Sequence, residues 1–498
     1  MNVACILEAG AEYFPDRTAV IEGGRQVRYG ELEAKAGRMA AALSRLGLGP
    51  GDVAAICLPG SSDWLAFYFG ALKAGCRVAT LFHGATGDEL KRLAADCQPA
   101  VVFTTEDKKA NLLEESGRAG FRGLFTPSDL ERSEAFAGFT SMNFRAVYRD
   151  RDDVAAILYT GGTTGTAKGV LLTHQNLLVS AHHVARYERS TETDRALCFL
   201  PLHHVFGQVH IMLATFLTAG TLILRPGFDL DDVLGVIREF QVTKFFAVPT
   251  IYIRLLDRPA LAERFRSVRY CFSAAANMAR EVVNQWKEKT GLAIHESYGL
   301  TESAAMVTFN HYYRHVVGSV GTPVGTVEVS IRDMGGQVLE PGRQGEITIK
   351  GPNVMKGYLG RPEETLSAFH GSWFRSGDVG MMDEAGYLYI VDRIKDMIIT
   401  GGENVYPREI EEYLHQHPEV AECTVVGLPD AEYGERVAAV IVPRPGTVIV
   451  PQTIRAFLRE RLSGYKVPKE YVVVDDLPRS AAGKVLKREV RRRLTEKK

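Results

Sequence analysis

Residues 159 to 170 read Tyr159-Thr-Gly-Gly-Thr-Thr-Gly-Thr-Ala-Lys-Gly-Val170, with glycines and threonines crowded around one lysine, Lys168. The apolar run 154–158 precedes this segment and is typical of a buried strand. Glycine lets the backbone approach an anion closely. Threonine hydroxyls and free N–H groups donate to phosphate oxygens, and a lysine adds a point charge. We therefore interpret the segment as a loop that grips a polyphosphate.

The segment differs from the Walker A loop, in which a lysine stands between a glycine and a serine or threonine. Here Lys168 follows Ala167 and precedes Gly169. The alternative interpretation is a flexible Gly/Thr turn between two strands, because glycine-rich turns are common.

The composition is that of an ordinary globular protein of 498 residues, which predicts two to four domains. The 59 basic residues balance 60 acidic ones, so no overall field favours nucleic acid as a partner. The seven cysteines are scattered without a C-x-x-C pair, which favours reduced thiols in a cytoplasmic setting and argues against a zinc site. No basic segment opens the chain, so we expect no signal peptide, and no apolar run reaches the roughly 18 residues of a membrane span.

One strong charge run occurs, at the carboxy-terminal tail. We interpret it as a solvated final helix, the alternative being contact with an anionic partner or the surface of a membrane. Its basic residues are Lys487, Arg488, Arg491, Arg492, Arg493, Lys497 and Lys498.

Strand-like and helix-like patterns alternate through the first two-thirds of the chain. Helical spacing covers 31–46 and 64–74, and buried-strand patterns cover 53–58, 78–82 and 244–248. Such alternation predicts parallel sheets covered by helices. The fold class is therefore α/β, with a large N-terminal domain of helix-flanked sheets.

The pattern changes after about residue 315. Glycine and proline become dense and strands such as 327–332 and 345–350 are short, which predicts a small β-rich subdomain at about 315–393. A charged junction follows near 392–396. Beyond it we expect a separate α+β domain, 394–498, with strands at 410–414, 421–426 and 437–442 and a helix at 452–462. The N-terminal domain then spans 1–393.

Several short motifs join the polyphosphate loop. Tyr298-Gly-Leu-Thr-Glu302 sets a hydroxyl beside a carboxylate, the kind of group that holds Mg²⁺ next to bound phosphates. Trp373-Phe-Arg-Ser-Gly-Asp378 ends on a carboxylate that could accept from ribose hydroxyls. Further motifs are Pro201-Leu-His-His204, Asp392-Arg393, Gly401-Gly-Glu-Asn404 and Gly483-Lys484.

This ordered set resembles the adenylate-forming superfamily of acyl- and aryl-CoA synthetases, non-ribosomal peptide adenylation domains and luciferases. The resemblance covers nearly the whole chain, and it is most like that of a fatty-acyl or related acyl-CoA synthetase. It implies that a carboxylic acid and ATP give an acyl-adenylate and pyrophosphate, after which coenzyme A displaces AMP. ATP, Mg²⁺ and coenzyme A are therefore the expected small molecules, beside the acid itself.

The resemblance also implies roles for individual residues. Lys484, Thr301, Glu302 and His204 would act at the reacting groups, with Glu302 holding Mg²⁺ and His204, rather than His203, gating the carboxylate. A packed core histidine is the alternative for His204. ATP would contact Thr160, Gly161, Gly162, Thr163, Thr164, Gly165, Lys168, Ala274, Ala275, Ala276, Ser297, Tyr298, Gly299, Thr301, Asp378 and Arg393.

The C-terminal domain of such enzymes is mobile. Lys395 would be the hinge, and rotation about it would exchange Lys484 for a coenzyme A-binding strand at Gly401, Gly402 and Glu403.

Two departures from the pattern of the superfamily stand out. Gly161 replaces the usual serine and Ala167 the usual proline, from which we expect weaker ATP affinity at most. The segment 273–278 has alanines and Asn277 where a glycine-rich run is usual.

The expected acyl site is largely apolar, lined by His204, Val205, Phe206, Gly207, Phe246 and Val248. Apolar walls favour an apolar acyl group, so we predict a medium- or long-chain fatty acid or another apolar acid. The alternatives are an aromatic or dicarboxylic acid, the latter with Arg269 as a candidate cation, and an enzyme that loads a carrier protein. A non-catalytic nucleotide- or acyl-binding protein is the alternative from another class.

Overall fold

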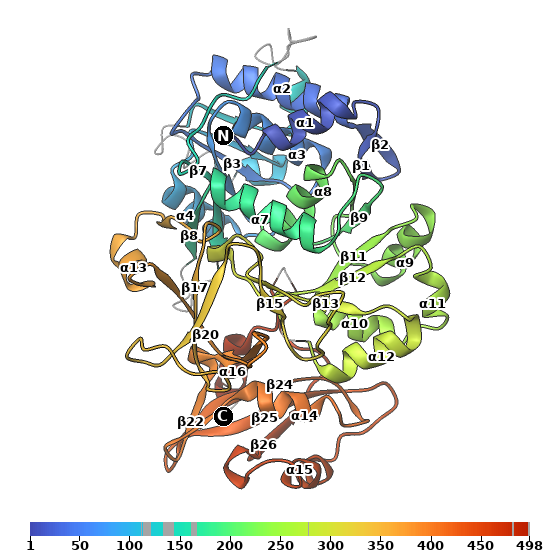
Figure 1. Ribbon diagram of the computed structural model, residues 1–498, viewed down its shortest axis with the longest axis vertical. Coiled ribbons are helices and arrows are strands. Elements are labelled where there is room, and N and C mark those ends of the chain that lie inside the picture. Colours follow the sequence, from blue (N-terminus) through green and yellow to red (C-terminus); the bar gives the residue numbers. More distant parts are fainter. Residues whose placement is uncertain are drawn as a thin grey trace.

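The computed structural model describes residues 1–110, 112, 121–132, 144–160, 167–276, 278–480 and 483–496. Two sheets flanked by helices form the upper part of the molecule, and a smaller domain lies below them (Figure 1). The predicted α/β class, with a large sheet domain and a small C-terminal domain, is confirmed.

The first sheet runs in the order β18-β8-β7-β4-β3-β5-β6. The strands β3, β4, β5, β6 and β7 are parallel, as the alternating pattern predicted. Its strands are β3 (Val53–Cys57), β4 (Arg77–Thr80), β5 (Val101–Thr104), β6 (Gly123–Phe125), β7 (Val154–Thr160), β8 (Lys168–Thr173) and β18 (Gly357–Tyr358). The helices of this part are α1 (Cys5–Tyr13), α2 (Tyr29–Arg45), α3 (Ser62–Lys73), α4 (Gly87–Cys97), α6 (Pro127–Arg132) and α7 (His174–Tyr187).

The polyphosphate loop joins two antiparallel strands rather than a strand and a helix. Thr160 at the end of β7 lies opposite Lys168 at the start of β8. Residues 161–166, which include Gly161, Gly162, Thr163, Thr164 and Gly165, lie outside the described residues. Lys168 is therefore fixed by a ladder of backbone hydrogen bonds at the root of the loop.

The second sheet runs in the order β13-β12-β11-β9-β10-β1-β2, and all but β2 are parallel. Its strands are β1 (Thr18–Glu22), β2 (Arg25–Arg28), β9 (Arg195–Cys198), β10 (Thr221–Leu224), β11 (Lys244–Ala247), β12 (Tyr270–Ser273) and β13 (Ile294–Glu296). Its helices are the π-helix η1 (Phe206–Leu213), α8 (Ala214–Leu217), α9 (Leu230–Glu239), α10 (Pro249–Leu256), α11 (Leu261–Arg264) and α12 (Arg280–Thr290).

A small antiparallel sheet follows and stands between the large sheets and the C-terminal domain (Figure 1). It runs β16-β17-β20-β19, with β21 paired to β20. The elements are η2 (Thr301–Ser303), β14 (Thr308–Phe309), β15 (Thr322–Pro323), β16 (Glu328–Arg332), β17 (Gly345–Lys350), α13 (Pro362–Ser367), β19 (Phe369–His370), β20 (Trp373–Met382) and β21 (Leu388–Arg393). Within this region β18 departs to pair with β8, which ties the small sheet to the phosphate loop.

The C-terminal domain has a core of its own, built around Ile398, Ile410, Val425, Ile441 and Leu458. Its elements are η3 (Ile394–Asp396), β22 (Ile398–Thr400), β23 (Glu403–Val405), α14 (Pro407–Leu414), β24 (Val420–Asp430), β25 (Gly434–Pro443), α15 (Pro451–Arg459), η4 (Gly464–Lys466), β26 (Glu470–Val473) and α16 (Lys487–Glu496). A separate core allows such a domain to move as a unit.

One strand prediction in this domain is wrong. Residues 410–414 belong to α14, which begins at Pro407. Ile410 and Leu414 are both buried and stand four residues apart, which is helical spacing, and proline is favoured in the first turn of a helix. The run was too short for its period to separate helix from strand.

The described part of the basic tail forms α16, and ion pairs occupy most of its cations. Lys497 and Lys498 lie outside the described residues. Lys487 pairs with Glu411 at 2.9 Å, Arg491 with Glu435 at 2.8 Å, and Arg492 and Arg493 with Glu489 at 2.7 and 2.8 Å. These contacts fit the interpretation of a solvated helix. No described helix has the length and apolar character needed to cross a bilayer.

A substitution where α2 crosses α3 tests the packing of the large core. A Cβ at Gly70 would lie 2.6 Å from Met39 Cβ and 2.8 Å from the Ala36 carbonyl oxygen. We therefore expect Gly70→Ala to destabilise the protein by about 1–3 kcal/mol through overpacking, measured as a lower denaturant midpoint. The control is Gly235→Ala in α9, where a Cβ meets nothing within 4 Å and no loss should occur. Equal midpoints for the two variants would contradict the tight crossing.

Candidate active site

The predicted nucleotide and acyl residues follow neighbouring parallel strands of the second sheet. His204 comes after β9, Val248 after β11, Ala274 after β12 and Ser297 after β13. The carboxyl ends of parallel strands share one edge of a sheet, which is where ligands bind in open α/β folds. The chain therefore brings these residues to one place although they span about a hundred positions.

The buried Asp378 and the partly exposed Arg393 form an ion pair at this edge. Pairing of β20 with β21 sets the two residues opposite each other, and Arg393 Nε donates to Asp378 Oδ1 at 2.7 Å. The Tyr298 hydroxyl donates to Asp378 Oδ2 at 2.6 Å. Burial and the neighbouring Asp378 raise the pKa of Tyr298 well above its usual range. Both carboxylate oxygens thus already accept one bond and keep capacity for another.

The turn after Tyr298 explains the glycine of its motif. A Cβ at Gly299 would lie 1.4 Å from the Ala305 carbonyl oxygen, so only glycine fits. Thr301 and Glu302 then open η2, with Thr301 buried. Tyr358 donates from its hydroxyl to Glu302 Oε1 at 3.0 Å, while burial raises the pKa of Glu302.

The wall after β12 has an unusual backbone. Ala275 has φ of 69°, a left-handed conformation that glycine adopts without strain. Ala274 is half-buried and Ala276 is exposed, and the buried Ser273 Oγ has no hydrogen-bond partner among the described residues. Asn277 lies outside the described residues.

Lys484 is brought to the same place from the far end of the chain. Gly483 has φ of 78°, and a Cβ there would lie 2.9 Å from Val248 Cγ2, so this turn packs against the acyl side of the sheet. Lys484 keeps solvent-exposed surface, yet protein packed around its ammonium and the nearby Arg393 lower its pKa to about 8. Burial, with a smaller effect of Lys484, lowers the pKa of His204 to about 4, which leaves that imidazole neutral.

The two adjacent histidines have different surroundings. The ring of His203 lies 5.0 Å from that of Phe82, on the side of the first sheet. His204 is the one close enough to Lys484 to be affected by its charge, and its Nδ1 accepts from the Phe206 amide at 3.3 Å. The structure therefore brings His204, rather than His203, towards the lysine.

The π-helix η1 carries further residues that were predicted to line the acyl site. Val205 precedes it, and a Cβ at Gly207 would lie 2.4 Å from the Pro201 carbonyl oxygen. Phe206, Phe246 and Val248 are all buried. Single π-helical turns are rare and occur frequently at functional sites.

Sequence reasoning missed a buried charged cluster behind these rings. His210 Nε2 lies 2.6 Å from Glu188 Oε1, and Lys244 Nζ donates to Glu188 Oε2 at 3.0 Å. Tyr270 also donates to Glu188, at 3.2 Å. Lys244 and His210 hold the pKa of Glu188 below its usual value, although burial acts in the opposite direction. No motif links these residues, because they meet only through the sheet.

The expected coenzyme A strand forms part of the sheet of the C-terminal domain. Gly401 and Gly402 have φ of 60° and 84° and form the turn between β22 and β23. The Gly401 amide donates to the Tyr433 carbonyl at 2.9 Å, within the C-terminal domain, and Glu403 is exposed. Lys395 lies in the 3₁₀ turn η3 between the two domains. The structure therefore presents Lys484, rather than the glycine turn, to the nucleotide residues.

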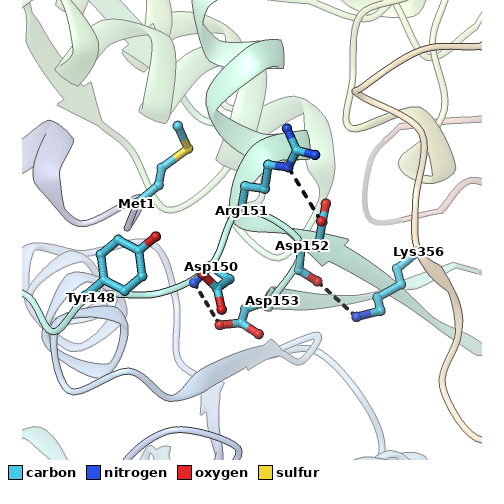
Figure 2. A pocket seen from close by; sticks show the side chains of 7 residues that line it. All are labelled: Met1, Tyr148, Asp150, Arg151, Asp152, Asp153 and Lys356. Carbon is cyan, nitrogen blue, oxygen red and sulfur yellow. Dashed lines mark hydrogen bonds and ion pairs between the residues drawn. The ribbon is translucent and has the colours of Figure 1, made fainter.

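A surface hollow elsewhere contains none of the predicted residues. It lies at the start of β7 and is lined by Met1, Tyr148, the loop 150–153 and Lys356 (Figure 2). Lys356 Nζ donates to the Asp152 carbonyl at 2.9 Å, and the Asp150 amide donates to Asp153 at 2.9 Å. These contacts tie the loop together and offer no reactive group.

Comparison with known proteins places the chain. Residues 7–359 match the family model of the AMP-binding enzymes, and residues 409–484 match that of the AMP-binding enzyme C-terminal domain. The chain belongs to the AMP-binding enzyme family. It is an acid–CoA ligase of the AMP-forming kind, which confirms the resemblance read from its motifs and makes ATP and coenzyme A its co-substrates.

Two relatives of this family cover almost the whole chain. The feruloyl-CoA synthase of an Amycolatopsis species is 36% identical over 97% of this chain and 97% of its own length. The long-chain-fatty-acid–CoA ligase of Bacillus subtilis is 33% identical over 99% of this chain and 94% of its own.

A solved structure of the family bears on the arrangement of the domains. ATP-bound MatB from Rhodopseudomonas palustris has 35% identity and a TM-score of 0.93, covering 100% of this chain and 99% of its own. The apo structure of the same protein gives 0.83 over the same coverage. The overall arrangement of this chain is therefore more similar to that of ATP-bound MatB than to that of apo MatB.

The lowered pKa of Lys484 predicts a limit on activity at alkaline pH. The ammonium loses its charge as the pH rises through about 8, so kcat/KM for ATP, which reports groups of the free enzyme, should fall above that pH. The measurement is pyrophosphate release between about pH 7 and pH 9.5. Lys484→Arg keeps its charge throughout this range, so the slower variant should lack the falling limb. The same limb in both proteins would assign it to another group.

Proposed function

We propose that this enzyme converts a compact aromatic carboxylic acid into its coenzyme A thioester through an acyl-adenylate. The observation that carries the proposal is a cluster of four aromatic rings in mutual contact, which we place at the floor of the acyl site. The rings are those of Phe206, His210, Phe246 and Phe272.

The rings are packed at the distances of direct aromatic contact. His210 stacks on Phe272 with centroids 4.2 Å apart, and Phe206 meets His210 edge-on at 5.3 Å. Phe246 lies 5.8 Å from His210 and 6.0 Å from Phe272. Aromatic faces and edges favour a further planar ring, whereas a long alkyl chain would have to displace them.

The charged cluster behind the rings limits the depth of the site. A long chain passing His210 would meet Glu188, Lys244 and Asp194, each about 2–3% exposed. Separating these charges is costly, because a buried charge without its partner is strongly destabilising. The floor therefore favours a short substrate over the long fatty acid that the apolar character of the expected lining residues predicted.

A dicarboxylic substrate would need a cation for its second carboxylate, but the two candidates, Arg269 and Lys244, already form ion pairs. Arg269 pairs with Asp194 and lies before β12, at the opposite end of that strand from Ser273. Lys244 pairs with Glu188 at 3.0 Å. These contacts argue against the dicarboxylic alternative.

The relatives do not separate the acids, because a feruloyl-CoA synthase and a long-chain-fatty-acid–CoA ligase are similarly close to this chain. Ferulate is an aromatic acid, so the first of them agrees with the ring-lined floor.

Electrostatics explains the roles proposed for the site residues. A carboxylate and a triphosphate are both anions, and positive charge fixed in advance where they meet stabilises the transition state. Lys484 would bridge the carboxylate and the α-phosphate, Lys168 and Thr160 would hold the outer phosphates, and Thr301 would contact the α-phosphate. Asp378 with Arg393 would orient the ribose, beside an adenine flanked by Ala274–Ala276 and Tyr298. The neutral His204 would line the entry of the carboxylate.

The residues present fit a magnesium ion. Mg²⁺ beside bound nucleotide takes one or two carboxylates and completes its shell with phosphate oxygens and water. Glu302 supplies such a carboxylate, held by Tyr358 at 3.0 Å, and among the described residues no cluster of acidic, histidine or cysteine side chains could hold a metal alone. When bound, the ion would neutralise phosphate charge.

Domain movement would connect the two steps. We place the boundary between residues 393 and 394, with Lys395 as hinge, because Arg393 ends the last strand of the small sheet and η3 follows directly. Rotation there would withdraw Lys484 and bring Gly401, Gly402 and Glu403 to the adenylate for attack by coenzyme A.

Lys484→Ala should separate the two steps. Loss of one transition-state contact slows a reaction by roughly 10²- to 10³-fold, so pyrophosphate exchange into ATP should fall by that factor. Thioester formation from preformed acyl-adenylate should be spared. Arg488→Ala, an exposed position on α16, is the control and should leave both steps intact. Equal losses in both steps for Lys484→Ala would argue against its assigned role.

A panel of acids tests the substrate class. With coenzyme A present, AMP release should be at least about tenfold more efficient, in kcat/KM, for an aromatic acid of benzoate or cinnamate size than for a fatty acid of about ten carbons or more. Phe206→Leu, which removes one ring from the floor, should reduce this preference. A wild-type preference for long-chain acids would sink the aromatic proposal.

A further inference from the structure

The ammonium of Lys168 has a carboxylate partner from a distant part of the chain. Lys168 Nζ forms an ion pair with Glu364 Oε2 and lies 5.1 Å from the ring centroid of Tyr358. Lys168 opens β8, whereas Glu364 lies in the short helix α13. The side chains are 21% and 38% exposed, so both can be reached from solvent.

Tyr358 joins this pair to the proposed magnesium carboxylate. Its ring contacts Lys168, and its hydroxyl donates to Glu302 Oε1 at 3.0 Å. Backbone pairing of Tyr358 with Val170 fixes the ring beside β8. Lys168, Tyr358 and Glu302 therefore form one frame, and Glu364 sits at its outer end.

Glu364 has a second cation within reach. Arg361 Nη1 lies 3.2 Å from Glu364 Oε1, and Arg361 Nη2 lies 3.7 Å from Asp96 Oδ1. Lys168, followed by Arg361, lowers the pKa of Glu364 and keeps it ionised at neutral pH. The carboxylate is thus shared between two basic side chains.

Phosphate and carboxylate oxygens are the same kind of partner for a lysine ammonium. A triphosphate that takes Lys168 must displace Glu364. Arg361 would remain as an ion-pair partner of the displaced carboxylate, so Glu364 would not lose all of its charge partners. Because partly exposed ion pairs are weak, the more highly charged phosphates win this competition.

We propose that Glu364 is a positioning residue that competes with the outer phosphates of ATP and with pyrophosphate for Lys168, and that passes to Arg361 when they bind. The proposal rests on the phosphate-binding role assigned above to Lys168. It implies that the carboxylate recaptures Lys168 as pyrophosphate leaves, which favours product release after the first step.

The test is titration calorimetry of the purified full chain with ATP, pyrophosphate and AMP, each with magnesium. Glu364→Gln keeps the shape and removes the charge. It should lower the Kd of ATP and of pyrophosphate by about two- to fivefold, the scale of a partly exposed ion pair. The Kd of AMP, which lacks the outer phosphates, should not change. Glu363→Gln removes the same charge from the exposed neighbouring position and should leave all three values unchanged.

A double-mutant cycle separates this inference from the function on which it rests. Lys168→Ala should weaken the binding of ATP and of pyrophosphate. Adding Glu364→Gln to that variant should not change either affinity further. The contrary outcome is that Lys168→Ala weakens the binding of ATP while Glu364→Gln binds ATP no more tightly than wild type does. That result would overturn the proposed competition and leave the phosphate-binding role of Lys168 in place. An equal fall in the Kd of AMP and of ATP in Glu364→Gln would also overturn the proposed competition, because it would indicate a general effect of charge. If Lys168→Ala binds ATP like wild type, the phosphate role itself fails.

Discussion

The ion pair between Asp378 and Arg393 holds together three parts of this enzyme. Asp378 belongs to the small sheet, and Tyr298, which donates to it at 2.6 Å, follows the last strand of the second large sheet. Arg393 ends β21 immediately before the turn into the C-terminal domain. The charges of both members reach Lys484, one lowering and the other raising its pKa. A change in this pair would therefore affect Tyr298, the turn η3 and Lys484 at once.

Positive charge at the site is held in two different ways. Lys168 is fixed at the root of a β-ladder and already has an anionic partner, Glu364. Lys484 arrives on a glycine turn of a domain with its own core, and its surroundings make its proton easier to lose. On the proposed function, the fixed Lys168 would suit a substrate that is held through a whole reaction step. Lys484, if the C-terminal domain rotates as proposed, would suit a charge that is needed for one step only.

On the acyl side, the charged residues are buried and pair with one another. Glu188, Lys244 and His210 are buried and satisfy one another behind a layer of aromatic rings. Such clusters add little net stability compared with an apolar core, but breaking one is costly. On the proposed function, this cluster would make the floor of the acyl site rigid, and the rings in front of it would give that floor an aromatic surface. Substrate choice would then depend on residues that carry no catalytic motif.

The sequence alone determined the parts of the protein that depend on local chemistry. Apolar periods gave the parallel strands and their helices, and the ordered motifs gave the family, because a polyphosphate needs glycines, hydroxyls and lysines at close spacing. Local pattern failed at 410–414, where five residues do not reveal a period, and it could not show that β18 leaves its own subdomain to pair with β8. Only the tertiary structure decided which distant side chains meet. Glu364 finds Lys168, and Glu188 finds His210 and Lys244, through sheet order and domain placement, and those are set by the packing of the whole chain rather than by any short segment of it.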